Sequence, residues 1–77
     1  MDDVLLLTKF GARVKRARLS LKLSQEKLAL ECDLDRTYIS SVERGRRNIS
    51  LINIYKLAHA LRVRASDLLV DSGGGKS

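Results

Sequence analysis

The sequence has no proline and no tryptophan among its 77 residues, and it contains one cysteine and one histidine. The single cysteine, Cys32, excludes an internal disulfide, and together with His59 it is too little for a Cys/His metal cluster. We therefore expect no metal and no other cofactor, and the lone thiol suits a reducing cytoplasm. Because His59 has no evident catalytic partner and no glycine-rich phosphate loop is present, we expect no enzymatic activity.

Long apolar runs are missing as well. The start, "MDDVLLLTKF", is acidic where a signal peptide needs basic residues, and its apolar run is four residues long. We therefore expect neither a signal peptide nor a membrane span. Aromatic residues are only 4% of a chain that is 44% hydrophobic, so the core must consist of Leu, Ile, Val and Ala. This composition, without proline, predicts an all-α fold with short connections.

Basic residues are in clear excess. Fifteen Lys and Arg against nine Asp and Glu give a net charge of +6. Such an excess indicates a polyanionic partner such as nucleic acid, with a merely solvated basic surface as the alternative. The length allows one small domain with a marginal core, and dimerisation would be a further source of stability.

The apolar spacing predicts a succession of short helices. The first has one apolar stripe at spacings of three and four, formed by Leu6, Phe10, Val14, Ala17 and Leu21. The next three each begin after a strong N-cap residue flanked by an apolar pair, the hydrophobic staple. The caps are Ser24, Asp35 and Ser50, and the pairs are Leu23 with Leu28, Leu34 with Ile39, and Ile49 with Ile54. We place these helices near 25–32, 36–44 and 51–61, with a fifth near 65–70. Residues 1–71 are assigned to one domain and 72–77 to a disordered tail.

Very few residues separate the second and third predicted helices, which forces the sharp turn of a helix-turn-helix. Ala29 is small where the two helices cross, and apolar residues fill the angle between them. The third helix therefore presents short and hydrogen-bonding side chains outward. An α-helix fits the major groove of DNA with its N-terminal residues toward the base edges. The predicted base-contacting residues are Arg36, Thr37, Tyr38 and Ser41, with packing as the alternative role of the tyrosine.

Basic side chains follow this helix in the segment "RGRRN", where Gly45 can take the positive φ that ends a helix. Contacts to phosphates fix the register of a protein on DNA, and helix N-termini attract phosphate through their free N–H groups. The predicted phosphate-contacting residues are Ser24, Gln25, Arg44, Arg46, Arg47, Asn48 and Asn53.

A homodimer is expected because one reading helix covers only a few base pairs. A twofold dimer places two such helices about one DNA turn, roughly 34 Å, apart. The dimer surface should lie away from the reading helix, on the last two helices. The predicted interface residues are Leu51, Ile52, Leu68, Leu69 and Val70, whose alternative role is to close the monomer core.

The run "LSQEKLALECDLDRTYISSVERGRRNISLINIYKLAHAL" resembles the Xre-type, lambda-repressor-like helix-turn-helix family, and the resemblance extends from about Phe10 to Leu69. Within that family, "LDRTYISSVERGRRNISLINI" is similar to the controller proteins of restriction–modification systems. The resemblance implies a compact five-helix lambda-repressor-like domain. It also implies a homodimer that binds double-stranded operator DNA upstream of its own gene and the endonuclease gene, with one or two dimers per operator. Such proteins activate and, at higher level, repress transcription of those genes.

Two positions depart from the family pattern, because Lys22 and Asp33 stand where glycine is common. Aspartate tolerates a left-handed conformation better than most residues, whereas a lysine with positive φ costs on the order of 1 kcal/mol. Neither departure threatens the expected fold.

The resemblance implies two further roles. Arg18, on the core side of the first helix, would form an ion pair with Glu43, with a DNA or solvent contact as the alternative. In lambda-repressor-like activators, acidic residues placed like Glu26 and Glu31 can touch the sigma subunit of RNA polymerase, and plain solubilising charge is the alternative. Two other functions stay open, namely a simple Xre-type repressor or antitoxin and a helical protein–protein adaptor without DNA binding.

Overall fold

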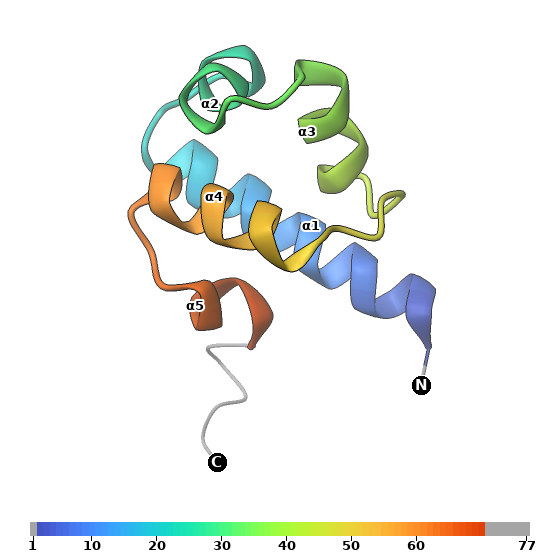
Figure 1. Cartoon of the computed structure of the whole chain (residues 1–77). Coiled ribbons are helices and arrows are strands. Elements are labelled where there is room, and N and C mark those ends of the chain that lie inside the picture. Colours follow the sequence, from blue (N-terminus) through green and yellow to red (C-terminus); the bar gives the residue numbers. More distant parts are fainter. Residues whose placement is uncertain (1, 71–77) are drawn as a thin grey trace.

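The structure is a computed structural model that describes residues 2–70, and every regular element in this range is a helix (Figure 1). The helices are α1 (Asp3–Ser20), α2 (Gln25–Cys32), α3 (Arg36–Glu43), α4 (Leu51–Leu61) and α5 (Ala65–Leu69). The predicted all-α, five-helix fold is therefore confirmed over the described residues, although α3 and α5 each end one residue earlier than predicted. None of these helices is long and apolar enough to cross a membrane. The predicted tail, 72–77, lies outside the described residues.

The N-terminal caps explain where the short helices begin. The hydroxyl oxygens of Ser24 and Ser50 accept hydrogen bonds from the backbone N–H three residues later, at 3.0 and 3.2 Å, as the sequence predicts. Asp35 occupies the N-cap position of α3, but its carboxylate accepts no backbone N–H. It accepts the hydroxyl of Thr37 instead. The expectation of a side-chain cap at Asp35 is therefore wrong, because a neighbouring side chain competes with the backbone for the same carboxylate.

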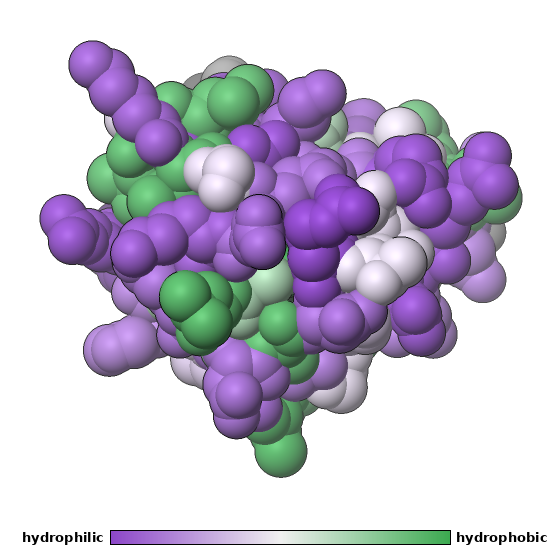
Figure 2. Space-filling model, turned by 90° about the horizontal axis from the view of Figure 1, so that it is seen from above, coloured by the Kyte–Doolittle hydropathy of each residue, from purple (hydrophilic) through white to green (hydrophobic). Residues whose placement is uncertain are grey.

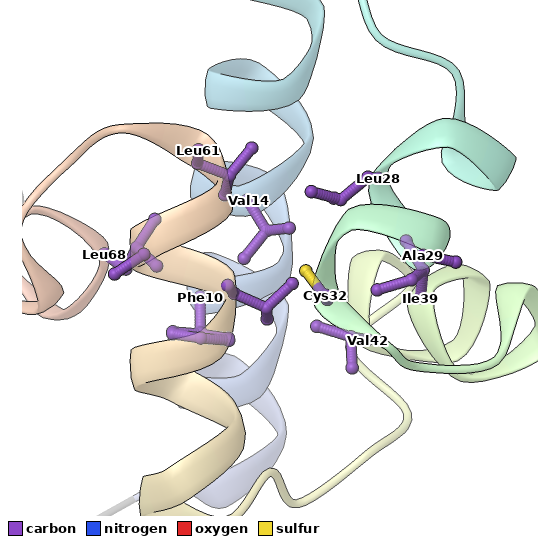
Figure 3. Close-up of a cluster of buried hydrophobic side chains, with 11 residues drawn as sticks. Phe10, Val14, Leu28, Ala29, Cys32, Ile39, Val42, Leu61 and Leu68 are labelled. Atoms are coloured by element: carbon purple, nitrogen blue, oxygen red, sulfur yellow. The ribbon is translucent and has the colours of Figure 1, made fainter.

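The core is enclosed by all five helices of the described chain (Figure 3). Its buried hydrophobic residues are Phe10, Val14, Leu28, Ala29, Cys32, Ile39, Val42, Leu57, Ala58, Leu61 and Leu68. The predicted stripe of α1 is confirmed for Phe10, Val14 and Ala17. Its last predicted member, Leu21, is the half-buried residue that follows the helix, and its first, Leu6, is 52% exposed. The reason is that the first turns of α1 extend past the other helices, so they have no partner to pack against (Figure 1).

A close crossing of α1 and α3 fixes the orientation of α3. A Cβ added at Gly11 would lie 2.2 Å from the carbonyl oxygen of Val42 and 2.8 Å from that of Glu43. Glycine is required here because any side chain would collide with the backbone of α3. With its inner face held this tightly against α1, α3 turns its other face to solvent.

The turns between helices depend on residues in the left-handed region. Lys22 and Asp33 have φ values of 60° and 59°, so both departures from the glycine pattern keep the conformation that glycine would favour. Gly45 follows α3 with φ 74°, as expected, and Arg62 ends α4 with φ 62°, which the sequence analysis did not anticipate. At Asp33 this conformation produces the sharp turn that carries the chain from α2 into α3.

Candidate nucleic-acid interface

The first turn of α3 is the most accessible part of the predicted reading surface. Arg36 and Thr37 are exposed, whereas Tyr38 and Ser41 are half-buried. Within the described residues, the side chain of Arg36 has no hydrogen bond or ion pair, so its guanidinium is available to an external partner. Hydrophilic side chains dominate the view from above Figure 1, the end of the molecule where α2 and α3 lie (Figure 2).

Tyr38 connects α3 to the elements that follow it. Its ring packs against the core, and its hydroxyl accepts a hydrogen bond from Asn53 Nδ2 at 3.1 Å. The guanidinium carbon of Arg47 lies 4.8 Å from the ring centroid, which is within the range of a cation–π contact. Tyr38 therefore has a packing role whether or not it also reaches a base. Three predicted DNA-contacting residues, separated in sequence, are brought together here.

The hydroxyls of α3 bond mainly within the helix. Ser41 Oγ donates to the carbonyl oxygen of Thr37 at 2.9 Å, and an Nη of Arg44 donates to the hydroxyl of Ser40. Each of these contacts spans one helical turn. Since a hydroxyl oxygen has two acceptor lone pairs, the Ser41 oxygen can still accept a hydrogen bond from a base edge.

A buried ion pair holds the end of α3 to α1, and it is also bonded to the loop before α2. Arg18 Nε lies 2.7 Å from Glu43 Oε2, and its Nη2 donates to Oε1 at 2.9 Å. The third Arg18 bond goes from Nη1 to the carbonyl oxygen of Leu23 at 2.7 Å. The hydrogen bond to Glu43 raises the pKa of Arg18, and burial partly offsets that rise. The ion pair that the resemblance implied is therefore present.

Gln25 joins the same network. Its Nε2 donates to Glu43 Oε1 at 3.0 Å. The sequence analysis gave Gln25 only a phosphate role, and it missed this contact because the two residues lie on different helices. The bond places the N-terminus of α2, with Ser24 and Gln25, beside the C-terminal end of α3 where Arg44 follows.

The basic loop after α3 is open to solvent. Arg44, Arg46, Arg47 and Asn48 are all exposed. The backbone N–H of Arg46 donates to the carbonyl oxygen of Ser41 at 2.9 Å, which folds the loop back against α3. The side chain of Arg46 has no hydrogen-bond or ion-pair partner in the part of the chain that the structure describes. The loop therefore presents several positive charges close to the reading face.

A second surface, which we call the α4/α5 patch, is apolar. It consists of Leu51, Ile52, Tyr55, Leu69 and Val70, which are between 51% and 69% exposed. Leu68 is only 1% exposed, so its predicted place in a dimer interface is wrong. Its side chain closes the monomer core, which was the alternative role. A groove of about 470 Å³ runs beside the patch and is lined partly by Leu51, Ile52 and Tyr55.

Cys32 and His59 are the one cysteine and the one histidine of the sequence. Among the described residues, no group of three or more His, Cys, Asp or Glu could hold a metal ion. Cys32 is buried, and its thiol donates a weak hydrogen bond to the carbonyl oxygen of Lys56 at 3.8 Å. Burial, reinforced by the nearby Glu31 carboxylate, raises the pKa of the Cys32 thiol to about 11. It therefore stays neutral and behaves as a small buried hydrophobe.

Comparisons with known proteins agree with this architecture. The model of the helix-turn-helix family HTH_3 matches residues 14–68. Control protein C.BamHI of Bacillus amyloliquefaciens is 61% identical over 61 residues, which are 78% of this chain and 75% of that protein. The crystal structure of the restriction–modification controller protein C.AhdI from Aeromonas hydrophila superposes with a TM-score of 0.79 at 52% identity, covering 80% of this chain and 94% of that one. The controller protein C.Esp1396I, solved as a tetramer in complex with its natural 35-base-pair operator, is 36% identical with a TM-score of 0.75 and covers 82% of this chain and 83% of that one.

Proposed function

Because the chain belongs to the HTH_3 helix-turn-helix family, and most of it matches restriction–modification control proteins, we propose that it is a sequence-specific, DNA-binding transcription regulator of the controller type. It binds operators upstream of its own gene and the endonuclease gene as a homodimer. It activates transcription at low level and represses it at higher level. It acts without a cofactor and without an enzymatic step, in the cytoplasm.

The observation that carries this proposal is the exposed guanidinium of Arg36 at the start of α3, beside an open basic loop. An arginine at the N-terminal end of a recognition helix can make a bidentate contact with guanine, which discriminates by about 1–3 kcal/mol against a wrong base. Thr37 can bond to a base or touch a thymine methyl. Arg46 and Arg47 then neutralise phosphates and fix the register.

The experiment compares Arg36→Ala with Arg46→Ala. Arg46 is the matched control because both arginines are exposed and neither side chain has a described partner, whereas Arg47 stacks on Tyr38. Binding sites are first selected from random DNA, and each variant is then measured on the selected site and on single-base changes of it. Arg36→Ala should relax preference at one base pair, and Arg46→Ala should weaken all sites alike. Equal effects on specificity would overturn this division of roles.

Salt dependence separates this function from the adaptor without DNA binding. A protein that neutralises several phosphates loses affinity steeply as salt rises, since bound counterions are released. Binding of the selected site should therefore weaken strongly between about 50 and 200 mM salt, and the slope should become shallower by about one for Arg46→Ala. If no binding site could be selected from random DNA, the result would instead support the protein–protein adaptor without DNA binding.

The homodimer rests on the α4/α5 patch. Four of the predicted interface residues, Leu51, Ile52, Leu69 and Val70, are exposed. Because C.Esp1396I was solved as a tetramer on its operator, one or two dimers of the present chain per operator are proposed. Analytical ultracentrifugation at micromolar concentration should show a dimer, and a monomer alone would refute this part.

A contact with the sigma subunit of RNA polymerase is proposed for the outer face of α2. Glu26 and Glu31 are both exposed, and Leu30 between them is 74% exposed. An apolar side chain flanked by carboxylates suits a protein partner that carries basic residues. Glu26→Lys should abolish activation while operator binding is retained, and survival of both would refute the contact.

A further inference from the structure

Tyr38 is the predicted base-contacting residue whose position depends on another helix. Its hydroxyl oxygen accepts a hydrogen bond from Asn53 Nδ2 of α4 at 3.1 Å, across 15 residues of sequence. By contrast, the Thr37 hydroxyl bonds to Asp35 and the Ser41 hydroxyl bonds to the Thr37 backbone, so both stay within the start of α3. Asn53 was predicted to contact phosphate, and its side chain bonds instead to a residue of the predicted reading surface.

Asn53 is a fixed anchor for this bond. Its backbone N–H donates to the Ser50 hydroxyl oxygen at 3.2 Å in the cap of α4, and the residue is half-buried. The next residue, Ile54, packs against the core. Asparagine has a lower helix propensity than alanine, so the helix itself does not favour it here. The Asn53 amide therefore holds the Tyr38 hydroxyl from a position that the rest of α4 keeps in place.

The ring of Tyr38 is held as well as its hydroxyl. It packs against the core, and the guanidinium carbon of Arg47 lies 4.8 Å from its centroid. Arg47 belongs to the loop that joins α3 to α4, so the side chain is contacted from the core, the loop and α4 (Figure 1). A side chain that is already fixed loses less conformational entropy when it binds a partner, which is worth about two- to tenfold in affinity.

The direction of the bond leaves the Tyr38 hydroxyl with a free proton. A phenolic hydroxyl both donates and accepts, whereas the amide nitrogen of Asn53 only donates. The phenol oxygen accepts from Asn53, and its proton has no acceptor among the described residues. The acceptors that DNA offers in the major groove are phosphate oxygens, guanine O6 and N7, adenine N7 and thymine O4. Cytosine N4 does not fit, because it is a donor.

We propose that Asn53 is a positioning residue for DNA binding, which holds Tyr38 so that its phenolic proton is presented to a hydrogen-bond acceptor on the DNA. The inference rests on the proposed DNA-binding function. It goes beyond that function because Asn53 acts through Tyr38 and not through a phosphate contact of its own. A bond that only fastened α3 to α4 would change stability and leave DNA binding by the folded protein unchanged.

The test is a double-mutant cycle of Tyr38→Phe and Asn53→Ala in the full chain, on a site selected from random DNA. Dissociation constants are measured on that site and on its single-base changes, and urea unfolding gives the stability of each variant. We expect each single change to weaken binding by about two- to tenfold, the range of one hydrogen bond. The double variant should bind no more weakly than Tyr38→Phe alone.

Asn48→Ala is the matched control for this cycle. Asn48 is exposed, was also predicted to contact phosphate, and its side chain has no described partner. Its loss of affinity should therefore add in full to that of Tyr38→Phe. The selected sites also identify the acceptor. A loss confined to one base pair assigns the Tyr38 proton to a base edge, and an equal loss on all sites assigns it to a phosphate oxygen.

Asn53→Asp tests the direction of the bond. A carboxylate only accepts, so the phenol must donate to it and its proton is no longer available to DNA. The added negative charge weakens binding to every site, but Tyr38→Phe should cause no further loss in this background. A further two- to tenfold loss would overturn the assigned direction. Aspartate is favourable in the first turn of a helix, so this variant is expected to fold even if Asn53→Ala does not.

Two other results overturn the inference. Losses from Tyr38→Phe and Asn53→Ala that add together would show that Asn53 contacts DNA by itself. Unchanged binding by Asn53→Ala with lowered stability would show that the bond only fastens α3 to α4. Both results leave the DNA-binding regulator standing, whereas a wild-type protein that binds no selected DNA refutes the proposed function together with this inference.

Discussion

Removing one partner of the Arg18–Glu43 ion pair should destabilise the fold severely. The two side chains are only 8% and 3% exposed, and they share two hydrogen bonds of 2.7 and 2.9 Å. Glu43→Leu leaves the Arg18 guanidinium buried without its counter-charge, and Arg18→Met leaves the Glu43 carboxylate in the same state. Breaking a buried pair in this way costs about 3–5 kcal/mol. Since domains are stable by about 5–15 kcal/mol and small ones have marginal cores, either variant would lose a large part of its stability but should still show an unfolding transition.

The double variant Arg18→Met/Glu43→Leu removes both charges. It therefore measures what the ion pair contributes to stability without the cost of leaving one buried charge unpaired. Replacing both ions by apolar residues of similar volume is often neutral, so the double variant should be more stable than either single one. Urea unfolding followed by circular dichroism gives all three values. Arg64→Met is the control, because the Arg64–Asp67 pair is 3.9 Å apart with its arginine 86% exposed, and its loss should have no measurable effect.

Two results would refute this reasoning. One is a loss below about 1 kcal/mol in both single variants, which would mean that the pair is effectively solvated. The other is a double variant whose loss equals the sum of the single losses, which would mean that the two residues are not coupled. No pH dependence is expected from Arg18, because its pKa is raised. Its contribution is complete below the ordinary pKa of arginine and is lost only above it, beyond the range of binding assays.

Three further changes test other features of the fold. Lys22→Gly should raise the free energy of unfolding by about 1 kcal/mol, because Lys22 has φ 60°, and the urea midpoint should rise with it. A lower midpoint would contradict the backbone strain assigned to Lys22. Gly11→Ala should cost about 1–3 kcal/mol, since its Cβ would lie 2.2 Å from the Val42 carbonyl oxygen, and an unchanged thermal midpoint would rule out the close crossing. Burial raises the pKa of Cys32 from 9.0 to about 11, so the unfolded thiol ionises first and stability should fall as pH rises from 9 to 11. In Cys32→Ala, stability should not show the part of this fall that comes from the thiol. If the wild type and Cys32→Ala lost stability equally between pH 9 and 11, Cys32 would not be its cause.

The helix boundaries were predictable because their signals are local. Ser24 and Ser50 accept backbone N–H groups of their own helices, so a few adjacent residues determine each start. The left-handed turn at Asp33 was expected from the family resemblance, because glycine is common at that position, and Asp33 has φ 59°. Asp35 shows the limit of this reasoning. Its cap was lost to Thr37, a competing side chain only two residues away, and composition does not reveal which of two acceptable partners a carboxylate takes.

Burial and tertiary contacts were less predictable because they depend on where whole helices end up. Leu6 and Leu68 have the same side chain, and each fits an apolar helical pattern. Yet Leu6 is 52% exposed while Leu68 is 1% exposed, because the first turns of α1 extend past the other helices and α5 packs against the core. Gly11 left a visible signal, since a glycine inside an apolar helical repeat often marks a close approach. Nothing in the sequence, however, identifies the α3 backbone as the neighbour.

Tyr38 shows why a division into base and phosphate contacts cannot be read from residue types alone. Its hydroxyl accepts a hydrogen bond from Asn53, and Arg47 lies over its ring. One predicted base-contacting residue and two predicted phosphate-contacting residues therefore contact one another, and a change in one can move the others. Removing Arg47 uncovers the ring and permits it to move, which would alter specificity even if Arg47 touched only phosphate. A specificity change in an Arg47 variant therefore does not identify it as a reader. Arg46, whose side chain has no described partner, reports on phosphate contacts without this coupling.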